Sequence, residues 1–363
     1  MVVLYLVGLL YTTNFERGLT NLEDRITMLL LPLVILSSPI LDRKTLDQVL
    51  KMFVLGCTAA VLIFYAVGFP EIYHKFGELF PQDLAFSPHR DFLVNTLKIH
   101  PTFMSLYLAY GFFIVFYFLL RKVTWRRTII GSVFLFLFAF AINLFASRLV
   151  IIASCLVLAV WIVSLFSSIY YKVGVVAGLA VLALILTQWF PQTIDRFREI
   201  QNTKWESPKE DNLNSINMRL AHWECSLKAI RKNWILGVGS GDGQDHINRC
   251  YQERDLAPIL HQRDFNAHNQ YLETWLAVGL PGLIAMLWLF GYLVGKAQQH
   301  RFVLLAVFVT LSGLLCLTDS IFERQKGVAF FFFFSSILVS YLVKDKASSE
   351  QTPKKLPESD YLI

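Results

Sequence analysis

The run TIIGSVFLFLFAFAINLFA at Thr128–Ala146 is followed, after Ser147-Arg148 alone, by a second run, LVIIASCLVLAVWIVSLFSS at Leu149–Ser168. Neither run contains an Asp, Glu, Lys or Arg. Each is long enough to cross a hydrocarbon layer of about 30 Å as a helix. Because backbone groups in lipid must bond within their own segment, such runs predict transmembrane helices.

Runs of the same kind fill most of the 363-residue chain, which is 55% hydrophobic and 17% charged with a mean hydropathy of +0.50. Soluble domains carry about a quarter charged residues, and the alternation of membrane strands is absent. We predict an all-α, polytopic transmembrane helical bundle of about ten spans. The spans are Met1–Tyr11, Ile26–Leu41, Leu46–Phe69, Ile99–Leu120, Thr128–Ala146, Leu149–Ser168, Lys172–Phe190, Tyr271–Val294, Phe302–Ile321 and Val328–Val343.

The spacing of these runs predicts four regions. Residues 1–190 hold seven transmembrane helices, 191–270 a large periplasmic loop with helices, 271–343 three more transmembrane helices, and 344–363 a disordered cytoplasmic tail. The first run is too short to cross a bilayer, so either it lies at the membrane interface or, as we favour, the true start of the chain lies further upstream. Basic residues crowd the turns on one side, among them Arg43, Lys44, Arg121 and Lys122, so this side is expected to be cytoplasmic. Their scatter at span ends excludes nucleic-acid binding as the reason for the net charge of +6.

The large loop contains one predicted helix at Ile216–Arg231. Its apolar stripe consists of Ile216, Leu220, Trp223, Leu227 and Ile230, flanked by Arg219, His222 and Ser226. Cys225 and Cys250 share the loop and can pair in an oxidising compartment, and the sequence leaves that pairing open. The glycine-rich run 237–243 imitates a nucleotide loop but lacks its βαβ context, so we interpret it as a flexible turn.

Three side chains are candidates for chemistry. His268 stands at the outer mouth of a span, where an imidazole can act as a general base, although a helix-entry residue would look the same. Arg148 lies between two apolar runs. Its planar guanidinium can donate two hydrogen bonds to a phosphate, or the side chain can extend to the lipid headgroups instead. Arg219 lies on the loop helix, where a solvated surface charge is the default interpretation of an arginine. Further candidates for substrate binding are Asn269, Gln270, Tyr271, His222, His100, Glu323 and Arg324.

The ordered motifs resemble those of the O-antigen ligase family, which includes O-antigen polymerases, over roughly Phe15 to Val343. They are Ser147-Arg148, Arg219-Leu-Ala-His-Trp223, Asn233-Trp-Ile-Leu-Gly-Val-Gly239, His268-Asn-Gln-Tyr-Leu272 and Glu273-Thr-Trp-Leu-Ala-Val-Gly279-Leu-Pro-Gly282. The resemblance implies a GT-C-like bundle, with about twelve spans in the full-length family member. This chain departs from the family by lacking the first one or two of them.

The resemblance also implies an activity: inverting, metal-independent glycosyl transfer with no cofactor, at the periplasmic side of the inner membrane. The donor is an O-antigen polysaccharide on undecaprenyl diphosphate, and the acceptor is a sugar of the lipid A-core. The family's catalytic histidine corresponds to His268 and its essential arginines to Arg148 and Arg219. Alternatives are an O-antigen polymerase, a protein O-oligosaccharyltransferase, or, in another class, a transporter or flippase for lipid-linked sugars. A transporter would carry charges inside several spans, whereas here the polar groups gather at one side.

Overall fold

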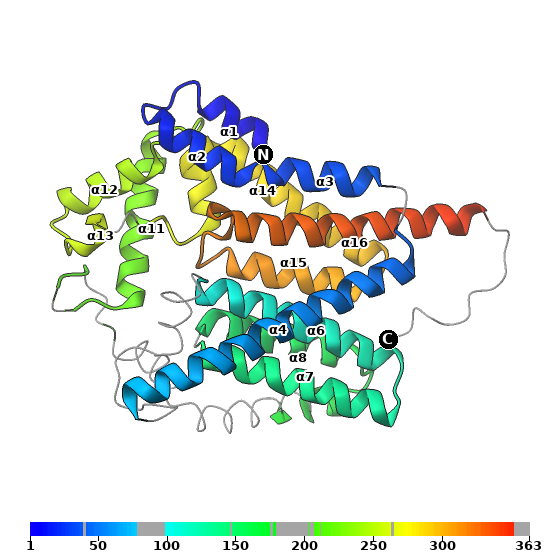
Figure 1. Cartoon of the computed structure of the whole chain (residues 1–363). Coiled ribbons are helices and arrows are strands. Elements are labelled where there is room, and N and C mark those ends of the chain that lie inside the picture. The colour runs from blue at the N-terminus through cyan, green and yellow to red at the C-terminus, as the bar shows by residue number, and fades with distance from the viewer. Residues whose placement is uncertain are drawn as a thin grey trace. The chain divides into compact units, whose positions relative to one another are not determined.

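The computed structural model describes residues 1–38, 41–77, 99–145, 147–174, 177–178, 203, 207–210, 212–262 and 265–351. Every regular element among these residues is helical, which confirms the predicted fold class (Figure 1). Within the described ranges, five helices are long and apolar enough to cross a bilayer. They are α4 (Arg43–Phe76), α6 (Pro101–Arg121), α7 (Trp125–Leu144), α14 (Gln270–Gln299) and α16 (Gln325–Gln351).

Other predicted spans form shorter helices. α8 (Arg148–Ser164) and α15 (Val303–Leu315) have 17 and 13 residues. α1 (Val2–Gly8) and α3 (Thr27–Ser37) have only 7 and 11 residues, and at 1.5 Å per residue neither reaches across about 30 Å of hydrocarbon. The predicted span Lys172–Phe190 lies largely outside the described residues. α16 continues to Gln351, past the predicted start of the C-terminal tail.

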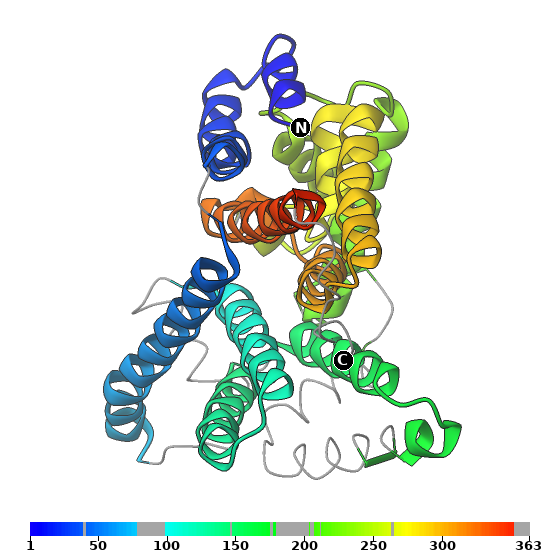
Figure 2. The ribbon, with the colours of Figure 1, turned by 90° about the vertical axis from the view of Figure 1, so that its right-hand side faces the viewer.

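The chain divides into two compact units. The first comprises Met1–Pro39, Glu199–Gln298 and Ser312–Ser340, and the second comprises Ile40–Arg198, Gln299–Leu311 and Tyr341–Ile363. In the second unit α6 packs against α4, α7 and α8 (Figure 2). Asp42 caps α4 by accepting from the Thr45 amide at 2.8 Å, and Pro101 occupies the first turn of α6. Gly131 of α7 lets the Leu119 side chain approach, since a Cβ there would lie 2.5 Å from it.

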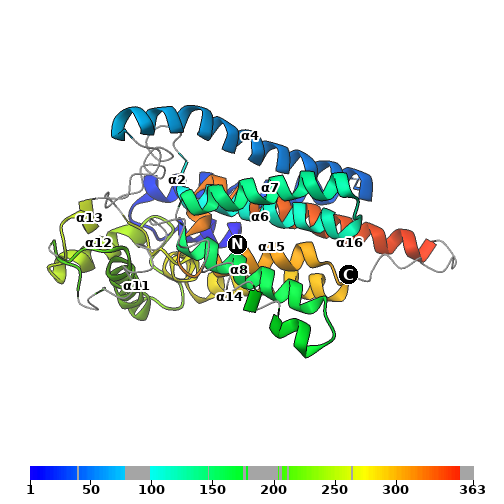
Figure 3. The same ribbon diagram turned by 90° about the horizontal axis from the view of Figure 1, so that it is seen from below.

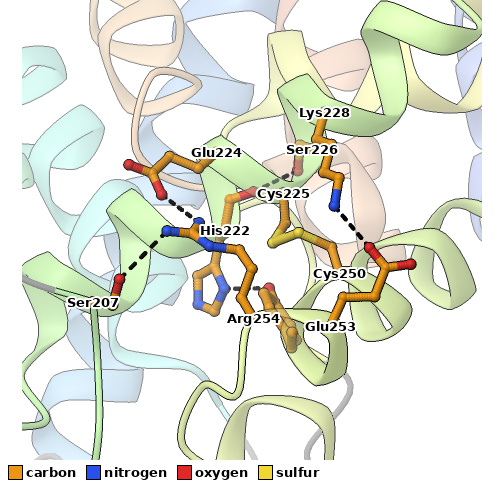
Figure 4. Close-up of a disulfide and its surroundings, with 10 residues drawn as sticks. Ser207, His222, Glu224, Cys225, Ser226, Lys228, Cys250, Glu253 and Arg254 are labelled. Atoms are coloured by element: carbon orange, nitrogen blue, oxygen red, sulfur yellow. Dashed lines mark hydrogen bonds and ion pairs between the residues drawn. A yellow bond between two sulfur atoms is a disulfide. The ribbon is translucent and has the colours of Figure 1, made fainter.

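The first unit contains a small helical domain formed by α11 (Ser215–Lys232), α12 (Gly243–Glu253) and α13 (Ile259–Gln262), which cluster together in Figure 1. A disulfide joins Cys225 of α11 to Cys250 of α12, so the pairing that the sequence left open is present (Figure 4). Lys228 pairs with Glu253 at 2.7 Å beside it. The disulfide and the buried apolar side chains around it give this domain a core of its own.

The buried face of α11 differs from the predicted apolar stripe. Of that stripe only Ile230 is fully buried, whereas the other buried positions are small or polar: Asn217, Ala221, His222, Cys225, Ser226 and Ala229. The helix buries polar groups because they have partners: Ser226 Oγ donates to the His222 carbonyl oxygen at 2.7 Å, and Asn217 belongs to a capping box with Asn214.

α14 is broken at Val278 and Gly279, and the loop after α11 fills the break. Val278 and Gly279 have non-helical backbone angles, with Gly279 at φ 70° and ψ −167°. The amides of Val238 and Gly239 donate to the carbonyl oxygens of Leu276 and Ala277 at 2.8 and 3.1 Å. The Leu280 amide in turn donates to the loop carbonyl of Trp234 at 3.0 Å. Backbone groups freed by the break are thus satisfied by protein, as apolar surroundings require.

The glycine-rich run is therefore a fixed structural loop and not the flexible turn that we predicted. Gly237 has φ 75°, and a Cβ there would lie 2.6 Å from the Gly279 amide nitrogen. Ser240 Oγ donates to the Tyr5 carbonyl at 2.6 Å, and the Gly241 amide donates to Thr12 Oγ1 at 3.0 Å. These contacts bring α1 and α14 together around one loop, and only glycine permits so close an approach of three backbones.

Candidate functional site

His268 is held in a sparsely populated backbone conformation at the start of α14. Its φ is +45°, in the left-handed region that non-glycine residues rarely adopt. Asn266 Oδ1 accepts from the His268 amide at 3.0 Å, and Asn269 caps α14 by accepting from the Tyr271 and Leu272 amides at 3.0 and 3.1 Å. Two asparagine side chains thus fix the backbone on both sides of His268. The positive φ that they hold is a local backbone strain of the kind that is frequent at functional sites.

The His268 side chain meets groups from two other parts of the first unit. Its Nδ1 lies 3.8 Å from Asp319 Oδ1, within the range of an ion pair when the ring is protonated. Its ring stacks on His222 of α11, with centroids 5.2 Å apart and planes inclined by 23°. Trp223 Nε1 donates to the His268 carbonyl oxygen at 3.4 Å. The predicted loop helix and the predicted base are therefore neighbours.

His222 is buried and neutral. Its Nδ1 is hydrogen-bonded to the Tyr251 hydroxyl. Burial, with the positive charges of His268 and Arg219 as smaller causes, lowers the pKa of His222 to about 3. At neutral pH the His222 ring that stacks on His268 is therefore uncharged.

A buried ionic network adjoining this site is the main feature that was not predicted from the sequence. Arg25, 1% exposed at the end of α2 (Phe15–Arg25), pairs with Glu323 of η1 (Ile321–Glu323), and its guanidinium lies 4.5 Å from the Tyr5 ring centroid. Glu273 of α14 interacts electrostatically with Arg25 and accepts from the Ala267 amide at 2.8 Å. The one available signal was a glutamate in the first turns of an apolar span, because such a residue needs a partner.

This network reaches both sides of the His268–Asp319 pair. Ala267 directly precedes His268, and Glu323 follows Asp319 by four residues. Removing one member of a buried ionic group leaves its partner uncompensated in a low-dielectric interior. Arg25 therefore ties the N-terminal helices to the two segments that carry the candidate base and its carboxylate.

Several predicted substrate-binding residues hold the local fold together. Gln270 is fully buried, and its Oε1 accepts from the Phe322 amide at 2.6 Å while its Nε2 donates to Thr274 at 3.2 Å. The Tyr271 hydroxyl donates to the Gly313 carbonyl at 3.1 Å. Glu323 is engaged by Arg25, whereas Arg324 is exposed at the start of α16.

Arg219 and Arg148 lie in different units. Arg219 is on α11, one turn before Trp223, and its charge acts on His222. Arg148 is the first residue of α8, and His100 is the N-cap of α6, both in the second unit. Within the first unit the structure brings together His268, His222 and the Arg219-bearing helix. The convergence of Arg148 with them stays a prediction.

The helices and this polar site define the class of the molecule: a multi-pass membrane protein with a site built at the mouth of a long apolar helix. Residues 133–287 match the family model described as O-antigen ligase. The matched region contains Arg148, Arg219 and His268, and it confirms the family resemblance predicted from the motifs. Residues 133–287 are thus similar to the O-antigen ligase family, a similarity that implies a glycosyltransferase-type enzyme.

A curated relative gives less information. An uncharacterised protein of Haemophilus influenzae (strain ATCC 51907 / DSM 11121 / KW20 / Rd) is 38% identical over 80 residues. The match covers 22% of this chain and 20% of the relative, so the chain spans about a fifth of that protein's length. Because this relative is itself uncharacterised, the match says nothing about activity.

Proposed function

We propose that this protein transfers a polysaccharide from undecaprenyl diphosphate to a sugar of the lipid A-core on the periplasmic side of the inner membrane. The acceptor hydroxyl oxygen attacks the anomeric carbon of the donor while the bond from that carbon to the diphosphate oxygen breaks. The configuration inverts, the proton of the hydroxyl passes to His268, and the diphosphate leaves with the electron pair. The reaction needs neither metal nor cofactor when arginines stabilise the leaving group.

The observation that carries this proposal is the setting of His268. The Asp319 carboxylate lies 3.8 Å from Nδ1 of His268, which leaves Nε2, on the other side of the ring, to accept a proton from the acceptor. The same carboxylate stabilises the imidazolium that forms. His222 adds no charge of its own to the pair, since its pKa is about 3. General-base catalysis requires a base that is held in a fixed position, and the contacts around His268 support that role.

The arginines are assigned to the diphosphate. A planar guanidinium donates two parallel hydrogen bonds to phosphate oxygens, and it keeps its charge at any physiological pH. Arg219 is carried by the helix that contacts His268 through Trp223. Arg148 is proposed as the second ligand because it begins α8 directly after an apolar helix.

The disulfide supports the periplasmic assignment. Cys225 and Cys250 join α11 to α12 in the same domain as His222. Structural disulfides persist in oxidising compartments such as the bacterial periplasm and are rare in the cytosol. A site built around this domain is therefore expected on the periplasmic face.

The base role is tested by His268→Gln in a reconstituted assay with purified lipid-linked donor and lipid A-core acceptor. We expect transfer to fall by about 10²–10⁴-fold, the usual contribution of a general base, while the protein still inserts and elutes normally. His246→Gln, at a half-buried histidine outside the site, is the matched control and should retain activity. Normal turnover by His268→Gln would eliminate the base role.

Two further substitutions separate the other roles. Asp319→Asn should lower kcat more than it changes KM, because the carboxylate acts on the imidazole and not on the substrate. Arg148→Lys should also impair transfer, since an ammonium cannot reproduce the planar fork. Full activity of the lysine variant would show that Arg148 contributes only its positive charge or anchors the helix, and that its planar geometry is not needed.

Deleting the gene distinguishes the ligase from its closest alternatives. Loss of all long chains from lipid A, with lipid-linked polymer accumulating, is expected for a ligase. Single-repeat caps retained on lipid A would indicate a polymerase, and unchanged lipopolysaccharide with loss of glycosylated proteins would indicate a protein O-oligosaccharyltransferase.

A further inference from the structure

A cavity of about 660 Å³ lies among α4, α6 and α7 of the second unit, far along the chain from the His268 site. These three helices pack against one another and run side by side (Figure 3). Each presents one face to the cavity: Lys51 and Leu55 on α4 are four residues apart, as are Val115 and Leu119 on α6 and Ile130 and Phe134 on α7. The cavity is therefore a regular feature of the helix packing.

The charged lining residues all stand at one end of the three helices. Lys51 is near the start of α4, Lys122 directly follows α6, and Arg127 is in the first turn of α7. Because α6 runs opposite to α4 and α7, its end meets their beginnings. Arg121 is neutralised there by Asp47, whose two oxygens lie 3.0 and 2.9 Å from its Nη1.

The other three cations are not neutralised in this way. Among the described residues, no carboxylate forms an ion pair with Lys51, Lys122 or Arg127. Lys51 Nζ lies 5.7 Å from the Phe118 ring centroid, and Lys122 and Arg127 are exposed. The mouth of the cavity is thus strongly positive, with four basic side chains against one carboxylate.

The rest of the cavity is hydrocarbon. Val54 and Val115 are buried in its wall, and Phe118, Ile130 and Phe134 complete it. From Arg127 to Phe134 the wall extends seven residues along α7, or about 10 Å at 1.5 Å per residue. A ligand of matching shape has an anionic group at one end and an apolar chain at the other. A nucleotide or a sugar phosphate would leave its polar groups against this apolar wall.

We propose that this cavity binds one anionic membrane phospholipid, with its phosphate among Lys51, Lys122 and Arg127 and the upper part of an acyl chain between the helices. Basic pockets between transmembrane helices commonly receive such headgroups. Occupancy would also complete the packing of α4 against α7, because a filled cavity restores dispersion contacts that an empty one lacks. The proposal does not depend on the transfer activity proposed for His268.

Native mass spectrometry of the full chain, with phospholipids titrated into the detergent, tests the proposal. The wild type should retain one phosphatidylglycerol in preference to phosphatidylethanolamine. Lys122→Gln with Arg127→Gln should weaken phosphatidylglycerol binding about 30-fold, since each Lys or Arg near a membrane surface contributes about a fivefold factor. Lys44→Gln with Arg126→Gln removes the same charge at the starts of α4 and α7, from residues that do not line the cavity, and this variant should bind as the wild type does.

A second variant acts on the wall and not on the charge. Ile130→Trp should lower retention of phosphatidylglycerol by filling the cavity while preserving its charges, with thermal unfolding in lipid-free detergent confirming that the variant is folded. Equal losses in the two charge variants, or equal retention of phosphatidylglycerol and phosphatidylethanolamine, would overturn the proposal. So would displacement of phosphatidylglycerol by equimolar undecaprenyl phosphate, which would assign the cavity to the donor lipid instead.

Discussion

Gly279→Ala should destabilise the protein more than any other glycine substitution in α14. The residue lies at φ 70° and ψ −167°, a region that essentially only glycine occupies, and forcing alanine into it costs about 1–3 kcal/mol. A Cβ there would also lie 2.1 Å from the Ile235 carbonyl oxygen, which is backbone and held in the loop after α11. Relieving that overlap adds about 1–3 kcal/mol, so we expect a total of about 4 kcal/mol.

Thermal unfolding in detergent, followed by intrinsic fluorescence, measures the effect. For a chain of this size about 2 °C of Tm accompanies each kcal/mol, so a drop of about 8 °C is expected. Gly291→Ala is the matched control in the same helix, because a Cβ there meets nothing within 4 Å. The control should be unchanged or slightly more stable, as alanine is in a helix interior. Equal Tm values for the two variants would refute the account of the break.

Three further perturbations test the first unit. The pKa of His222 is about 3 in the folded protein and 6.5 in the unfolded chain, so the unfolded chain takes up a proton first and the protein becomes less stable as the pH is lowered. About 2 kcal/mol of stability should be lost between pH 8 and pH 5. His222→Phe should abolish this loss when unfolding is measured as a function of pH. Replacing Cys225 and Cys250 by serine should remove about 3 kcal/mol, measured by urea unfolding with and without reductant, and no change in the midpoint would contradict the disulfide. Arg25→Met alone should cost about 3–5 kcal/mol, whereas adding Glu323→Gln should recover most of it; additive losses in this double-mutant cycle would argue against a buried pair.

Two parts of the candidate site followed from residue type and position. A histidine at the mouth of an apolar span and an arginine on the loop helix are visible in the chain as polar groups where an inert bundle has no need of them. The roles of their neighbours were not visible. Gln270 and Tyr271 resembled substrate ligands until their hydrogen bonds to Phe322 and Gly313 appeared. A polar side chain looks the same in sequence whether its partner is a substrate or a backbone group 42 or 52 residues away.

Sequence alone determined that the chain is a bundle of membrane helices, because the hydrophobic requirement of each span acts locally, residue by residue. The sequence also indicated the family, because several short motifs occur along the chain in the order that the family shows. Tertiary structure decided the break in α14, the fixed course of the glycine-rich loop, and the burial of Arg25 against Glu323. Each of these depends on backbone or charged groups that must find partners far away in the chain, and neither hydropathy nor helical spacing records which partner is chosen.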